Sequence, residues 1–295
     1  MSDLGLPATE ARNDDARGLD TMVAADLVAL FAREQRLAAD AVADASPAIA
    51  RAVDAIVERL RRGGTLHYFG AGTSGRLAML DAAECPPTFG TAPSLVVAHV
   101  AGGEIALVRA IEGAEDNARA GAAQVRAHLD ARDVAVGISA SGGARYVLGA
   151  LAKAREIGAL TIGVTSVANS VLASDCDIAI VVETGAEPIA GSTRLKAGTA
   201  QKLVLNALST ATMVRLGHAY DNVMVDVVAT NTKLAARARR LVVTLANVDD
   251  DRATELLAAA DGRVKTAVVM AVHAVDAATA NELLAASGGF LRALL

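Results

Sequence analysis

Apolar positions repeat in two different ways along this chain. Residues 21–63 show the three- and four-residue spacing of amphipathic helices, and Gly63-Gly64 ends that segment. After it, short apolar runs alternate with longer segments of helical pattern. Short, fully apolar runs are typical of buried parallel strands. We therefore expect five strands, at residues 66–69, 95–100, 134–138, 160–164 and 178–182.

The segments between these runs predict the crossover helices of a parallel sheet. They cover residues 76–83, 105–129 and 144–157, with a short one near Ser170. Alternation of this kind predicts an α/β fold with a doubly wound, mostly parallel five-stranded sheet and helices on both faces. Ligands of such sheets bind at the carboxyl ends of the strands.

The remainder of the chain is predicted to be helical around this sheet. Residues 1 to about 20 are expected to form a loosely ordered arm, and Ser192 or Thr193 is expected to cap a helix that reaches Leu216. Beyond Asp226 only helices are expected, at about 231–245, 252–260, 264–271 and 276–286. The resulting division is an N-terminal arm and helices packed on the core (1–60), an α/β domain (61–225) and a small C-terminal helical subdomain (226–295).

Composition excludes several classes of partner. Hydrophobic residues make up 53% of the 295 positions, yet charged residues interrupt every apolar stretch before it could span a bilayer, and the polar N-terminus lacks a signal-peptide core. We therefore expect a cytoplasmic protein with no membrane partner. The net charge of −5 argues against binding nucleic acid. The two cysteines and the five histidines show no metal-ligand spacing, so no metal site is expected.

The most informative segment is the glycine-rich turn at residues 70–75, Gly-Ala-Gly-Thr-Ser-Gly, which joins the first strand to a helix. A helix N-terminus offers free N–H groups and a favourable dipole to an anion, and here Gly72, Thr73 and Ser74 would lie beside it. The pattern also fits the dinucleotide-binding fingerprint. No acidic residue ends the second strand, however, which disfavours NAD. A merely structural tight turn is the remaining alternative.

Two further turns have the same character. Ser139, Ser141 and Gly142 follow the third strand, and Ser192, Thr193 and Lys196 precede the long helix after Gly191. Serines are common in loops, and the third turn alone fits an ordinary helix cap. Because the first two turns lie at carboxyl ends of strands in one sheet, together they predict a site for a sugar phosphate.

Carboxylates supply the candidate chemistry. Glu84 lies in an apolar segment before Cys85-Pro-Pro, which is expected to stop the helix, and we expect it to be partly buried. Partial burial would raise its pKa and suit it to act as a general acid. Glu112 and Glu115 would share a face of the helix at 105–129, and their spacing does not choose between them.

Several long blocks resemble the N-acetylmuramic acid 6-phosphate etherase family, which belongs to the wider sugar-isomerase (SIS) superfamily. They are GAGTSGR (70–76), DAAECPPTFG (81–90), AGGE (101–104), AED (114–116), GSTRLKAGTAQKLVLNALST (191–210) and MVDVVATNTKL (224–234). The resemblance implies an SIS-type domain at 61–225 and a cytoplasmic, homodimeric lyase without a metal or organic cofactor. Its implied reaction cleaves the D-lactyl ether of N-acetylmuramic acid 6-phosphate to N-acetylglucosamine 6-phosphate and D-lactate, in peptidoglycan recycling.

The resemblance also assigns roles to residues. The family's two catalytic glutamates fall on Glu84 and Glu115, with Glu84 as proton donor and Glu115 as its acid/base partner. The phosphate-facing threonine expected after the second turn is missing, because Ala144 occupies its place and Arg145 follows. A sugar-phosphate isomerase and a non-catalytic sugar-phosphate sensor are the alternatives, and retention of both glutamates favours catalysis.

Overall fold

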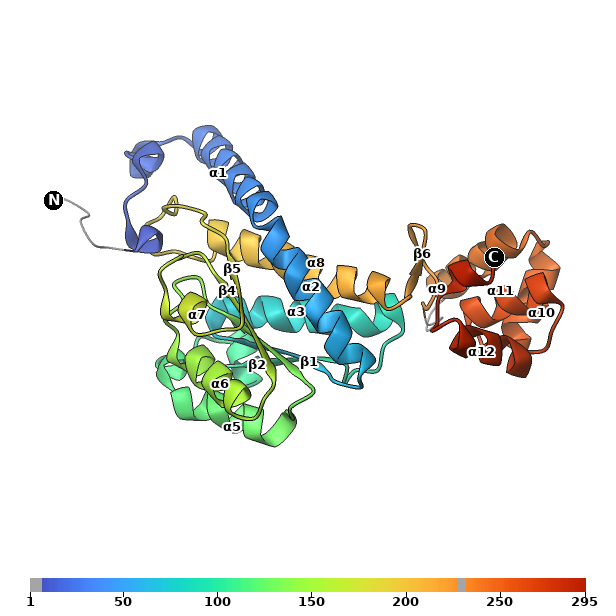
Figure 1. The fold of residues 1–295 in the computed structure, drawn as a ribbon. Coiled ribbons are helices and arrows are strands. Elements are labelled where there is room, and N and C mark those ends of the chain that lie inside the picture. Colours follow the sequence, from blue (N-terminus) through green and yellow to red (C-terminus); the bar gives the residue numbers. More distant parts are fainter. Residues whose placement is uncertain (1–6, 228–231) are drawn as a thin grey trace. The chain divides into compact units, whose positions relative to one another are not determined.

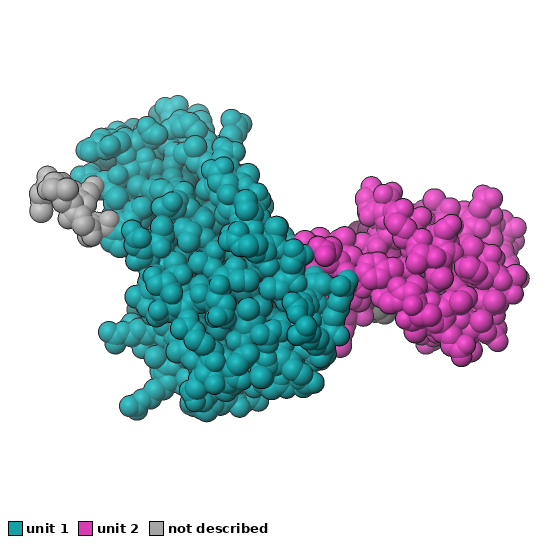
Figure 2. Space-filling view, viewed as in Figure 1, with its two compact units in different colours: residues 1–82, 94–209 teal, residues 83–93, 210–295 magenta. Residues whose placement is uncertain are grey.

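The computed structural model describes residues 7–227 and 232–295. The chain forms two compact units, one made of residues 1–82 and 94–209 and the other of residues 83–93 and 210–295 (Figure 2). The first unit contains the five-stranded sheet, and the second contains the C-terminal helices.

The sheet confirms the predicted fold class. Its strands are parallel and are ordered β2-β1-β3-β4-β5. In this register Gly70, the last residue of β1, pairs with Val100 and with Ile138, so the carboxyl ends of three strands meet at one edge. The strand bounds are β1 Leu66–Gly70, β2 Val96–Val100, β3 Val134–Ile138, β4 Leu160–Thr165 and β5 Ile178–Val181.

Helices cover both faces of the sheet (Figure 1). The helices α5 (Ala118–His128) and α6 (Arg145–Glu156) lie on one face, and α2 (Ser46–Arg61) and α3 (Gly72–Phe89) lie on the other. Glycines allow α5 and α6 to approach closely, because a Cβ at Gly121 would collide with the carbonyl of Tyr146. The chain crosses from β1 to β2 and from β3 to β4 in opposite directions along the sheet. Because both crossovers are right-handed, α3 and α6 lie on opposite faces.

Residues 7–23 form defined turns, and the expectation of a loosely ordered arm is wrong for this described part of the chain. Three short 3-10 turns, η1 (Ala8–Glu10), η2 (Asp14–Ala16) and η3 (Leu19–Thr21), lead into α1 (Ala24–Asp44). Thr9 is buried, and Asn13 caps η2 by accepting a hydrogen bond from the N–H of Asp15. Short polar turns lack the hydrophobic periodicity on which the prediction depended.

Helix α3 continues past the point where the sequence predicted its end. It passes through Pro86 and Pro87 and ends at Phe89, where Gly90 adopts a φ of 64°. A proline in a helix removes one backbone hydrogen bond to the preceding turn. Here the two prolines fall in the last turn, and the N–H of Gly90 still donates to the carbonyl of Pro86 at 2.9 Å.

The predicted helix at residues 105–129 is instead three pieces. They are α4 (Ile105–Val108), η4 (Ala114–Asp116) and α5. Gly113 has a φ of 70°, a left-handed conformation that interrupts a helix, and Asn117 begins α5 by accepting a hydrogen bond from the N–H of Ala120. Glu112 and Glu115 therefore do not share a helical face.

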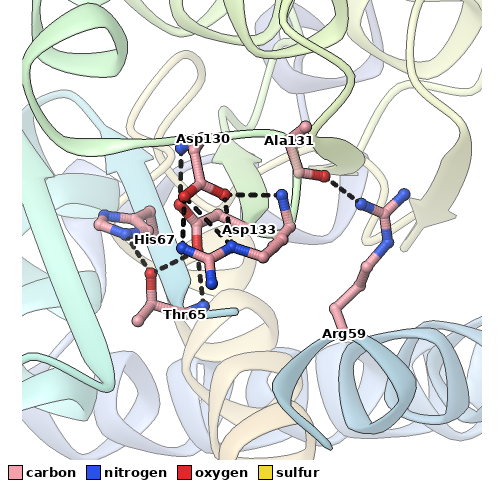
Figure 3. A network of polar contacts seen from close by, with 7 residues as sticks. Arg59, Thr65, His67, Asp130, Ala131 and Asp133 are labelled. Carbon is pink, nitrogen blue, oxygen red and sulfur yellow. Dashed lines mark hydrogen bonds and ion pairs between the residues drawn. The ribbon is translucent and has the colours of Figure 1, made fainter. Parts of the chain in front are cut away.

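A polar network joins the amino ends of β1 and β3 (Figure 3). Asp133 accepts hydrogen bonds from the N–H and the hydroxyl of Thr65, both at 2.7 Å. Thr65 also bonds Nε2 of His67 at 2.7 Å, and Nδ1 of His67 lies 2.9 Å from Nε2 of His99. Burial lowers the pKa of both histidines to about 4, so both imidazoles are neutral at pH 7.

The second unit has a hydrophobic core of its own, which includes Val242, Leu256 and Val268. A two-stranded hairpin that the sequence did not predict, β6 (Ala219–Tyr220) and β7 (Val223–Met224), precedes its helices. The expected C-terminal helices are present, although residue 231 lies outside the described residues. Their bounds are α9 Thr232–Ala246, α10 Asp250–Ala259, α11 Val264–His273 and α12 Ala277–Ala286, and the turn η5 (Leu291–Ala293) follows.

Within residues 7–227 and 232–295, no single helix has both the length and the hydropathy of a membrane span. Only α11 and α12 taken together reach that level, and they are bent by 102°.

Candidate active site

The first wall of the site is the start of α3. The turn is tight because a Cβ at Gly75 would lie 2.7 Å from the carbonyl oxygen of Gly70. The first turn of a helix leaves its N–H groups free for an anion. Thr73 and Ser74 lie in this turn, and Ser74 donates a hydrogen bond to Oε1 of Gln201 at 2.9 Å, which fixes its hydroxyl.

The second wall is the turn between β3 and α6. Oγ of Ser139 accepts hydrogen bonds from the N–H groups of Gly142 at 3.1 Å and Ala144 at 3.4 Å. Gly142 has a φ of 69°, and a Cβ there would collide with Ser170. The hydroxyl of Ser141 accepts a hydrogen bond from the N–H of Gly143 at 3.3 Å. This network holds the turn open at the N-terminus of α6.

Both turns line one cavity of about 500 Å³ in the first unit. Five hydroxyl side chains and three carboxylates contribute to its lining. They are Thr73, Ser74, Ser139, Ser141 and Thr193, with Glu10, Glu115 and Asp116. Helix N-termini and hydroxyls favour a phosphate, whereas carboxylates accept hydrogen bonds from neutral donors or transfer protons. The cavity can therefore hold a phosphorylated molecule that has neutral polar groups at its other end.

The structure places the remaining predicted binding residues outside this lining. Gly142 shapes the turn, and Ser192 adjoins Thr193 without lining the cavity. Lys196 is buried and forms an ion pair with Glu34, with Nζ 2.8 Å from Oε2. The side chains of this pair are only 3% and 1% exposed. Lys196 thus interacts with a partner on α1 that its sequence neighbourhood did not indicate.

The cap of the long helix α8 (Lys196–Arg215) differs from the prediction. Neither Ser192 nor Thr193 begins the helix. The carboxylate of the fully buried Glu187 accepts hydrogen bonds from the N–H groups of Lys196 at 2.9 Å and Ala197 at 3.0 Å. A carboxylate at a helix N-terminus is stabilised by the helix dipole.

The two predicted catalytic glutamates lie in different surroundings. Glu115 lies on η4 and lines the cavity, whereas Glu112 does not line it. Glu84 belongs to the segment 83–93 of the second unit, and it is exposed. The expectation that Glu84 is partly buried is therefore wrong for the single chain. Ala83 beside it, and Leu80 and Pro87 one turn away on the same side of α3, are also exposed, so no described part of the single chain covers this surface.

Sequence reasoning missed Glu10 and Asp116 as cavity residues. Asp116 stands next to Glu115 in the AED block, which was a usable signal. Glu10 gave none, because a glutamate in a polar N-terminal segment looks like solvated charge. Among the described residues, no group of three His, Cys, Asp or Glu side chains could hold a metal ion.

Comparison with known proteins identifies the domain that contains this cavity. Two domain models match, the glucokinase regulatory protein N-terminal SIS domain over residues 48–155 and the SIS domain over residues 116–211. A phosphoheptose isomerase from Francisella tularensis shares the fold with a TM-score of 0.51 and 23% identity, over 65% of this chain and 98% of that chain.

Similarity to curated proteins covers nearly the full length. An N-acetylmuramic acid 6-phosphate etherase of Streptomyces coelicolor is 49% identical over all of this chain and 95% of its own length. One from Salmonella schwarzengrund is 48% identical over 99% of both chains. With this identity, an SIS fold and a cavity that combines anion-binding turns with carboxylates, the chain belongs to the N-acetylmuramic acid 6-phosphate etherase family of carbon–oxygen lyases.

Proposed function

We propose that this enzyme cleaves the D-lactyl ether of N-acetylmuramic acid 6-phosphate and releases N-acetylglucosamine 6-phosphate and D-lactate. The observation that supports it best is the single cavity in which Glu115 lies with the hydroxyls of both strand-end turns. The substrate is a phosphorylated amino sugar that would be handled in the cytoplasm. No metal or organic cofactor takes part in the proposed steps.

The 6-phosphate would bind where α3 and α6 begin. Thr73 and Ser141 offer hydroxyls there, and the helix N-termini contribute N–H groups and dipoles. The hydroxyl of Ser74 would donate to the phosphate only by giving up its bond to Gln201. Ser139 shapes the second turn through its two backbone contacts. Holding the phosphate fixes C2 and C3 of the sugar near the carboxylates, which lowers the entropy cost of reaching the transition state.

The reaction needs a base and an acid. Ring opening gives an aldehyde at C1, which acidifies the proton on C2. A carboxylate removes that proton, the C3–O bond breaks, and a carboxylic acid protonates the departing oxygen of lactate. Water then adds across the C2–C3 double bond of the unsaturated aldehyde, which places a hydroxyl on C3 and a proton on C2. Ring closure gives the product sugar. We assign the proton donor to Glu84 and the acid/base partner to Glu115.

A homodimer accounts for the exposure of Glu84 on the single chain. Hydrogen bonds from Ser74 to Gln201 and from Asn206 to Asp81 join α3 to α8. These helices expose Leu80 and Leu203, which are 50% and 36% exposed. We assign the interface of the proposed homodimer to this surface, where the two leucines would be buried against another copy.

Release of D-lactate tests the proposed reaction directly. Purified enzyme is incubated with N-acetylmuramic acid 6-phosphate, and D-lactate and N-acetylglucosamine 6-phosphate are quantified. We expect equimolar products, with Glu115→Gln and Glu84→Gln lowering turnover by a factor of about 100 or more. Glu112→Gln is the matched control and should retain activity. Sugar-phosphate binding without lactate would support the sensor alternative, and an aldose–ketose product would support the isomerase.

Mixing the two inactive variants tests whether a site uses both subunits. Glu84→Ala and Glu115→Ala dimers are combined under conditions that exchange subunits. If the glutamates of one site come from different copies, mixed dimers contain one intact site, and about a quarter of the wild-type activity returns. If both come from the same copy, no activity returns.

A further inference from the structure

A third glutamate, Glu10, lines the same cavity and comes from the N-terminal segment. It lies at the end of η1, close to the loop that contributes Gly191 and Thr193. A Cβ placed on Gly191 would lie 3.0 Å from Oε2 of Glu10, so the carboxylate rests against this backbone. The segment that the sequence predicted to be a loose arm therefore contributes to the cavity wall.

Backbone and side-chain contacts fix the segment in this position. The N–H of Gly191 donates to the carbonyl of Thr9 at 3.0 Å, and the side chain of Thr9 is buried. Nδ2 of Asn13 donates to Oε2 of Glu34 at 2.8 Å and to the carbonyl of Ala186 at 3.1 Å. Thr9 and Asn13, which flank Glu10 in the sequence, are thus both bonded to the loop at residues 186–191.

The partner of Asn13 is itself anchored. Oε2 of Glu34 also accepts from Nζ of Lys196, and both side chains are almost fully buried. Loss of one member of a buried ion pair leaves the other charge without a partner, which is strongly destabilising. This network connects the N-terminal segment, α1 and the start of α8. It holds Glu10 in place before a ligand arrives, which reduces the entropy cost of binding.

The charge of Glu10 determines what it can recognise. An ionised carboxylate only accepts hydrogen bonds, and it repels other anions. The phosphate and the lactyl carboxylate of the proposed substrate are therefore unsuitable partners. The neutral donors of the sugar are its ring hydroxyls and its acetamido N–H.

We propose that Glu10 is a substrate-binding residue that accepts a hydrogen bond from a hydroxyl or the amide N–H of the sugar, and so favours a sugar phosphate over free phosphate. This inference rests on the proposed function, because it names the ligand class of the same cavity. It adds a contact supplied by the N-terminal segment to the acid–base pair.

Inhibition by two ligands separates this role from a structural one. The lactate assay gives KM and kcat for wild type, Glu10→Ala and Glu10→Gln, and competition gives Ki for N-acetylglucosamine 6-phosphate and for inorganic phosphate. A hydrogen bond to a charged acceptor predicts that Glu10→Ala raises KM and the sugar-phosphate Ki about 10- to 100-fold. The Ki of inorganic phosphate should stay the same or fall, because a negative charge has been removed. Glu10→Gln retains an acceptor and should lie between.

The control is Asp15→Ala, an exposed acid in the same segment that does not line the cavity. It should match wild type in every measurement. 2-Deoxyglucose 6-phosphate, which has no donor on C2, identifies the donor. An effect restricted to the N-acetyl sugar indicates the amide N–H, and an equal effect on both indicates a hydroxyl.

The inference is overturned if Glu10→Ala matches wild type, or if it weakens inorganic phosphate and sugar phosphate equally. If wild type releases no lactate while Glu10→Ala still weakens only the sugar phosphate, which direct calorimetric titration would measure, the proposed reaction fails and the role of Glu10 stands.

Discussion

The paired histidines His67 and His99 should make the stability of this protein fall steeply in mild acid. Each is buried, and the Nδ1 of His67 lies 2.9 Å from Nε2 of His99, so the pair shares a hydrogen bond only while one ring nitrogen remains unprotonated. Both pKa values are lowered to about 4 in the folded chain, from 6.5, mainly by burial. The nearby Asp133 opposes this shift for His67, and His128 adds to it for both.

The sign and size follow from proton linkage. Between pH 6.5 and pH 4 the unfolded chain binds more protons than the folded chain, so the stabilising effect is present above the unfolded pKa and is lost as the pH falls. For a pKa that drops from 6.5 to about 4, each imidazole lowers the free energy of unfolding by about 2 kcal/mol between pH 7 and pH 5. The pair therefore accounts for about 2 to 4 kcal/mol, a large part of the stability of a typical domain.

Urea unfolding at pH 7 and at pH 5 measures this loss. The double variant His67→Gln/His99→Gln retains polar side chains but cannot titrate. It should be less stable than wild type at pH 7 and should lose much less stability on acidification. His273→Gln is the matched control, because His273 is exposed and its Nε2 bonds the carbonyl of Leu294 rather than another titratable group. Equal losses in wild type and in the double variant would refute the reasoning.

Three substitutions test the walls of the cavity. Gly142→Ala should destabilise the protein by about 2 kcal/mol or more, seen in thermal melting, because of its left-handed φ of 69° and the collision with Ser170. Ala144→Thr adds a hydroxyl to the cavity lining and should lower the KM for the sugar phosphate up to about tenfold, and an unchanged KM would show that this hydroxyl does not reach the phosphate. Asn13→Ala should raise KM about tenfold, as Glu10→Ala does, and the double variant should be less than additive.

The sequence predicted the sheet more accurately than it predicted the loops. All five strands lie within two residues of their expected bounds, because fully apolar runs separated by polar segments leave few alternatives. The prediction of one helix at 105–129 was wrong because the left-handed Gly113 interrupts it and Asn117 caps a new helix, despite the apolar periodicity around them. The end of α3 was wrong because prolines in a final turn remove few hydrogen bonds.

In the candidate site, too, the sequence located the residues at strand ends but not those in distant segments. Thr73, Ser74, Ser139 and Ser141 could be placed from strand–turn–helix patterns, since the parallel register brings strand ends together. Glu10 could not be placed, because nothing in the local sequence indicates a contact with residues about 180 positions later. The pairing of Lys196 with Glu34 also joins positions distant in sequence, so periodicity carried no signal for it.

The hydrogen bond between Thr9 and Gly191 has a practical consequence for handling the enzyme. Truncation of the chain past residue 10 would remove both this contact and the carboxylate of Glu10 from the cavity wall. If Glu10 binds substrate as proposed, a truncated enzyme that still folds should show a raised KM.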